Sequence, residues 1–336
     1  MQKTFADLGR VDAIRELFEG TGFAPFGEPL GYKTLSSDTS VSASRLLQEG
    51  LDFNLVYFPL KHLGYKAALA VTGELYASLA RPKTLSVNLA VSAKLDFEQI
   101  RELWSGVVSA ATEHGYESLS LDLQPSGNGL QIGVCASGAV SHLTSMRRSE
   151  PKSKDLVCVS GSLGAAYLGL RLLEKERLNF EAESSYDEDA LKQHKMLVAA
   201  YLKPELQADI VQQLEDAQIY PTAGYFVTRG LSDAVLRLSR DCGLGAKIYA
   251  DKIPFEGGSF SVGKNLDLDP VSAAMNGGDD FKLLFTVPIM KTEVLRKDFQ
   301  TFDIIGHLAR EEAGAVLVTP EGVELPLTAQ GWKDKR

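Results

Sequence analysis

The segment NGGDDFKLLFTVP, Asn276–Pro288, decides how the rest of this chain is interpreted. Two glycines and two adjacent acids precede an apolar run that predicts a strand over Lys282–Val287. Asp279 and Asp280 point to opposite sides of an extended backbone, so we expect one to face a cleft and the other to cap or pair locally. Two interpretations remain open: a turn that begins a core strand, and a glycine-acid loop beside a nucleotide or a metal.

Length and composition are those of a globular protein with two domains. The chain has 336 residues, of which 44% are hydrophobic and 24% charged. Its net charge is −9 and no basic block stands out, so nucleic acid is not an expected partner. A phosphorylated small-molecule ligand would need a local positive site or a divalent metal. No signal region or membrane-spanning run is evident, so we expect a cytoplasmic protein without membrane association.

The cysteines and histidines predict no zinc site. Cys135, Cys158 and Cys242 are far apart and odd in number, which indicates reduced thiols rather than a disulfide framework. The five histidines form no spaced pair, and we interpret them as structural.

Strands alternate with helices in both halves, which predicts two mixed α/β or α+β domains. The charged connector RRSEPKSK, Arg147–Lys154, places the boundary between residues 1–147 and 148–336. Helices are predicted at Val11–Phe18, Leu60–Ala80, Asp96–His114, from Gly164, and at Ser185–Leu202, Pro204–Ala217 and Ser232–Cys242, with Asp96 and Ser232 as N-caps. Strands are predicted at Lys83–Val91, Glu117–Asp122, Leu130–Ser137, Asp155–Ser160, Ala246–Ile253, Lys282–Val287 and Ala315–Val318.

Long segments of the chain resemble bacterial thiamine-monophosphate kinases, which belong to the superfamily of aminoimidazole ribonucleotide synthetase. Besides the opening segment, these are Leu55–Val71, Asp155–Glu174, Tyr201–Gly224, Ala250–Phe255 and Leu325–Trp332. The resemblance implies an N-terminal mixed-sheet domain that pairs in a homodimer, and an α+β C-terminal domain. It also implies transfer of the γ-phosphate of ATP to thiamine monophosphate, with Mg²⁺ held by carboxylates.

The acidic motifs of that family are only partly kept. The first, GxGDDA, corresponds to FGEPLGYK, Phe26–Lys33, where Glu28 is the only acid. The second corresponds without gaps to Ala43–Phe53, where Arg45 replaces the ligand Asp and Asp52 replaces a His. An alternative register on Ser37–Asp38–Thr39 needs an insertion, so we prefer the gapless one.

The remaining motifs keep one acid each. Glu74 replaces the Asp of NxSD, and Asp122 persists although Ser120 and Leu121 replace the two glycines before it. In the fifth motif Asp233 persists, while Gly230 stands in place of an Asp.

The resemblance assigns roles to seven residues. Metal ligands would be Glu74, Asp122 and Asp233; ATP contacts would be Asp122, Asp233, Arg148 and Arg45; substrate contacts would be Asp280 and Trp332. No catalytic acid or base is assigned. Simpler alternatives stay open: a turn cap for Asp122, a helix-dipole acid for Asp233, and tail packing for Trp332. Because Arg45 reverses a charge beside Glu74 in the family geometry, we also expect those two to pair.

Three functions follow from these readings. The favoured hypothesis is a divergent kinase homologue with weak or no activity. The alternatives are a fully active kinase with a remodelled metal site, and a non-enzymatic scaffold that binds a ligand or a partner chain. Another ATP-using reaction of the superfamily, such as cyclisation of a ribonucleotide, fits the long matches less well.

Overall fold

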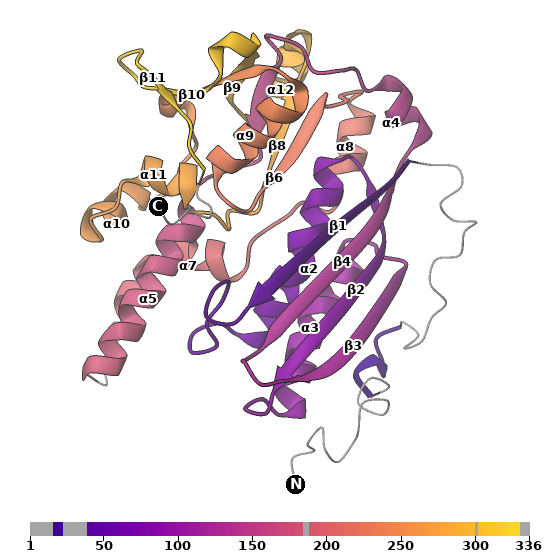
Figure 1. Cartoon of the computed structure of the whole chain (residues 1–336), viewed down its shortest axis with the longest axis vertical. Helices are drawn as coiled ribbons and strands as arrows, with labels where there is room; N and C mark the ends of the chain where they lie inside the picture. Colours follow the sequence, from indigo (N-terminus) through magenta and orange to yellow (C-terminus); the bar gives the residue numbers. More distant parts are fainter. Residues whose placement is uncertain (1–15, 23–38, 184–187, 300–301, 330–336) are drawn as a thin grey trace, which may run out of the picture. The chain divides into compact units, whose positions relative to one another are not determined.

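The computed structural model describes residues 16–22, 39–183, 188–299 and 302–329 (Figure 1). The chain separates into two compact units: unit 1 is Met1–Met146 with Gln207–Val211, and unit 2 is Arg147–Leu206 with Gln212–Arg336. Trp332, the loop at Phe26–Lys33 and most of the predicted first helix lie outside the described residues.

Unit 1 is a four-stranded sheet with strand order β1-β4-β2-β3 and two long helices, α2 and α3, against one face (Figure 1). Strands β2 and β3 are parallel and α3 connects them, while the other neighbours are antiparallel. The elements are β1 (Thr39–Gln48), α2 (Leu60–Ala77), β2 (Arg81–Ser92), α3 (Phe97–Glu113), β3 (Ser118–Ser126), β4 (Gln131–Val140) and α4 (His142–Arg147), the last of which ends at the unit boundary.

Local sequence explains how the two helices of unit 1 form and pack. Asp96 accepts the backbone N–H of Gln99 at 2.8 Å and Gln99 reciprocates, a capping box that confirms the predicted start of α3. The helices cross closely at Gly64 and Gly106, where a Cβ would lie 1.9 Å and 1.8 Å from backbone oxygens of the other helix. The small, apolar composition of α2 therefore serves helix–helix contact.

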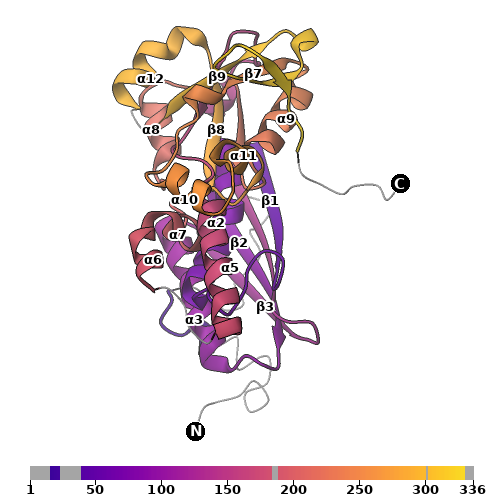
Figure 2. The same cartoon turned by 90° about the vertical axis from the view of Figure 1, so that its left-hand side faces the viewer.

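Unit 2 is a seven-stranded sheet with strand order β11-β10-β7-β9-β5-β8-β6. Helices α9 and α12 lie on opposite sides of it (Figure 2). The strands are β5 (Leu156–Val159), β6 (Ala223–Val227), β7 (Gly245–Tyr249), β8 (Lys282–Val287), β9 (Asp303–Ala309), β10 (Ala315–Val318) and β11 (Glu324–Pro326). The helices are α5 (Ala165–Glu183), α6 (Glu188–Gln193), α7 (Lys195–Leu202), α8 (Ile210–Asp216), α9 (Leu231–Cys242), α10 (Ser259–Asn265), α11 (Pro270–Asn276) and α12 (Thr292–Asp298).

Several predicted boundaries were wrong. The predicted helix Pro204–Ala217 begins only at Ile210 and ends at Asp216. The predicted helix Ser185–Leu202 is divided into α6 and α7 at His194. Ser232 is not the N-cap of α9, because the helix begins one residue earlier, after Gly230.

The predicted strand Ala246–Ile253 ends at Tyr249, where a 3₁₀ turn over Ala250–Lys252 follows. Strands β1, β6, β9 and β11 were not predicted. Among the described residues no helix is long and apolar enough to cross a membrane.

Candidate functional site

The glycine-acid loop between α11 and β8 is tied by its backbone to the end of β6. The N–H of Asp279 donates to the carbonyl of Thr228 at 3.0 Å, and the N–H of Phe281 donates to that of Val227 at 2.9 Å. Gly278 has a φ of +83° and a Cβ there would lie 3.1 Å from the Thr228 oxygen. The glycine therefore allows two chain segments to run in close contact.

The backbone of this loop is strained. Asp279 and Phe281 have φ values of +60° and +54°. Asp tolerates the left-handed region, but for a bulky aromatic residue it is an outlier that surrounding contacts must enforce. Here Phe281 is buried and packs edge-on against Phe226 with ring centroids 5.4 Å apart. The buried packing of Phe281 on Phe226 therefore holds the two neighbouring acids, Asp279 and Asp280, in place.

Asp280 caps helix α5. Its side chain is only 4% exposed, and its Oδ2 accepts the N–H of Gly164, directly before α5, at 3.0 Å. Desolvation raises the pKa of this carboxyl to about 7, although backbone hydrogen bonds and Lys282 oppose the rise. One of the two acids was expected to cap or pair locally; Asp280 does cap a helix, but that helix begins 116 positions away in the sequence.

Two buried oxygens at this loop have no hydrogen-bond partner within the described part of the chain: Oδ1 of Asp280 and Oδ1 of Asn276. No role was predicted for Asn276, and only a helix start was predicted at Gly164, which the start of α5 at Ala165 bears out to within one residue. Gly164 has a φ of +77°, and a Cβ there would lie 2.8 Å from the backbone nitrogen of Ala274. Nothing local in GSLG marks Gly164 as the partner of Asp280, because the two residues are 116 positions apart.

Asp233 is engaged by its own helix. Its Oδ2 lies 3.0 Å from Nε of Arg237, one turn further along α9. Arg237 also lies over the ring of Tyr225, with 5.4 Å between guanidinium and ring centroid. The carboxylate therefore has a fixed positive neighbour, in addition to the helix N-terminus that was expected to stabilise it.

Arg148 has a structural partner in unit 2. Its Nε donates to the carbonyl of Thr222 at 3.2 Å, just before β6. Burial lowers the pKa of its guanidinium below the ordinary value. The hydroxyl of Thr222 in turn donates to buried Asp155 at 3.0 Å. Arg148 thus anchors the start of unit 2.

Arg45 and Asp122 lie on opposite faces of the sheet in unit 1. Arg45 is in register with Val134 and Val87, which are buried on the helix-covered face. Asp122 is in register with Asn88 and Gly133 on the other face. Because side chains alternate along strands, this sheet does not bring the two predicted phosphate contacts together.

The expected pair of Arg45 with Glu74 is not what the structure shows. Nη2 of Arg45 lies 3.7 Å from Oδ1 of Asp52, whose Oδ2 accepts the N–H of Gln48 at 2.9 Å. Arg45 and Asp52 are only seven residues apart, so their ion pair closes the turn after β1 locally. A pair with Glu74 would instead have to reach helix α2. Glu74 lies near the end of α2, on the side of the sheet opposite Asp122.

A Mg²⁺ site of the family type would need Glu74, Asp122 and Asp233 to come together around one ion. Glu74 and Asp122 belong to unit 1 and Asp233 to unit 2. In the part of the chain that the structure describes, no three acidic, histidine or cysteine side chains come close enough together to hold one ion. The predicted ligands do not form a protein cage within either unit.

Comparison with known proteins places this geometry in context. The chain is 24% identical over 332 residues to a thiamine-monophosphate kinase of Aquifex aeolicus, covering 98% of both chains. It is 28% identical over 250 residues to the one of Synechococcus elongatus, covering 73% of this chain and 71% of the relative. It is 24% identical over 283 residues to a putative hydrogenase expression/formation protein of Methanocaldococcus jannaschii, covering 81% and 78%. No family model matches.

Solved structures show the same fold. The structure of AaThiL complexed with AMPPCP and TMP matches with a TM-score of 0.71 at 23% identity, covering 94% of this chain and 93% of that one. Escherichia coli HypE matches with a TM-score of 0.70 at 19% identity, covering 96% and 97%. The mixed two-sheet architecture is therefore the predicted synthetase-like fold.

Proposed function

Because this chain belongs to the thiamine-monophosphate kinase family, we propose that it binds a phosphorylated small molecule and transfers phosphate from ATP to thiamine monophosphate weakly or not at all. ATP and thiamine monophosphate are the ligands to test, since the related AaThiL structure holds AMPPCP and TMP.

The ion pair between Asp233 and Arg237, at 3.0 Å, carries this proposal. Kinases bring ATP and an anionic acceptor together by screening charge with metal ions on free carboxylates. An acid that already pairs with a guanidinium through one oxygen binds a metal less favourably than a free carboxylate does, because the two cations repel each other. Capping of α5 by Asp280 points the same way, because its Oδ2 already serves the protein.

A fully active kinase with a remodelled metal site is the second candidate. Two observations favour it: the match to the Aquifex kinase extends over 98% of the chain, and Oδ1 of Asp280 is buried without a partner among the described residues. The third candidate, a non-enzymatic scaffold, would need neither nucleotide nor thiamine phosphate.

One assay separates these candidates. Thiamine diphosphate formation is measured with ATP, Mg²⁺ and thiamine monophosphate, beside calorimetric titrations of AMPPCP and of thiamine monophosphate. We expect turnover below about 0.01 s⁻¹, against the 1–100 s⁻¹ that is usual for kinases, with micromolar binding of at least one ligand. Turnover near 1 s⁻¹ that falls in Asp122→Asn would establish the active kinase instead. Absence of binding by both ligands would leave the scaffold.

We further propose that residues 1–147 carry the ancestral nucleotide and dimer functions, and that the chain forms a homodimer through the open face of the sheet in unit 1. That face is built from small polar side chains, such as Ser86 and Ser120, whose hydroxyls are 2.8 Å apart. Cys135 is exposed there. Flat faces of this kind suit contact between two copies of a sheet.

Light scattering tests the dimer, with an expected mass of twice 36.5 kDa. Thiol labelling of Cys135 should also slow as the protein is concentrated, while Cys242 in unit 2 serves as the internal reference. A monomer mass with labelling independent of concentration would refute the homodimer.

A further inference from the structure

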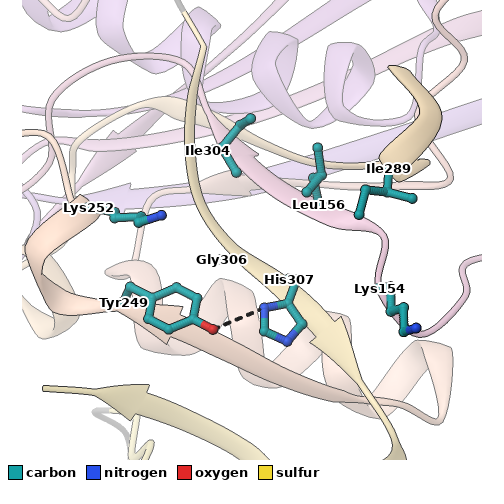
Figure 3. A pocket seen from close by; sticks show the side chains of 8 residues that line it. All are labelled: Lys154, Leu156, Tyr249, Lys252, Ile289, Ile304, Gly306 and His307. Carbon is teal, nitrogen blue, oxygen red and sulfur yellow. Dashed lines mark hydrogen bonds between the residues drawn. The ribbon is translucent and has the colours of Figure 1, made fainter. Parts of the chain in front are cut away.

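We draw no further inference here: the strongest candidate, the apolar hollow of about 250 Å³ beside Gly306 on the sheet of unit 2, lined by Leu156, Ile304 and Tyr249 among others (Figure 3), carries none, because nothing in the part of the chain that the structure describes shows what covers it.

Discussion

The carboxylate of Asp280 accepts the backbone N–H of Gly164 at 3.0 Å, although 116 positions separate the two residues. This contact joins the start of β8 to the start of α5 and uses one of the two acids that define the glycine-acid loop. An acid at a helix N-terminus satisfies free N–H groups and is stabilised by the helix dipole. The loop therefore has a structural function that holds whether or not a ligand binds there.

The raised pKa of Asp280 predicts a pH dependence of stability. The pKa is about 7 in the folded chain and 3.8 in the unfolded one. Between these values the native state keeps the proton that the unfolded chain has released, so stability contributed by this group falls as pH rises from 4 to 7. The upper bound is about 4 kcal/mol, at roughly 1.4 kcal/mol per pKa unit. Urea unfolding at pH 5 and pH 7.5 measures the fall.

Asp280→Asn should abolish most of that pH dependence, since Asn keeps an acceptor oxygen without a titrating group. Asp279→Asn is the matched control, because Asn tolerates the φ of +60° at the neighbouring position. An unchanged pH slope in Asp280→Asn would show that other groups are responsible.

Gly164→Ala should destabilise unit 2 by about 2–4 kcal/mol, because it combines a left-handed backbone with a steric clash. The new Cβ would lie 2.8 Å from the backbone nitrogen of Ala274 at a φ of +77°. Gly243→Ala is the control: its φ is +64°, with no atom within 4 Å of the new Cβ. Thermal unfolding should show the larger loss for Gly164→Ala. Equal losses would mean that the clash is relieved by small shifts.

The pair of Asp233 with Arg237 should contribute about 0.5 kcal/mol in a double-mutant cycle of Asp233→Asn and Arg237→Gln. Both side chains are partly exposed, at 21% and 31%, so solvent screens their attraction. The coupling should shrink between low salt and 1 M salt. A coupling of zero at low salt would remove the observation on which the proposed weak activity rests.

Tyr76→Phe should cost unit 1 about 1–3 kcal/mol by leaving buried groups unsatisfied. The Tyr76 hydroxyl lies 3.0 Å from the carbonyl of Ala208 and 3.0 Å from Nδ1 of His114. It has a single proton, which it gives to the carbonyl, so His114 must donate from Nδ1. Tyr65→Phe is the control, since its hydrogen bond to Glu113 lies at the surface. Denaturant unfolding in which both variants lose equally little would contradict this network.

Elements with strong local signals were predicted well. The strands Lys282–Val287 and Ala315–Val318 have the predicted bounds. The start of α3 follows from Asp96 and Gln99, which cap it within one turn. By contrast, strand β1 was not predicted: its serine-rich sequence was interpreted only as an altered acidic motif. The strand is defined by its pairing with β4, whose residues lie far along the chain.

The sequence by itself determined the family resemblance, the two mixed domains and the substitutions in the acidic motifs, because these depend on residue identity and short-range periodicity. Tertiary structure alone decided what the surviving charges do. Asp280 caps a helix that begins far away in sequence, and Arg45 is separated from Asp122 by the sheet itself. The hollow beside Gly306 likewise depends on a bulge that shifts the register of β9 against β5. Such relationships depend on strand register and loop closure, which residue types do not specify locally.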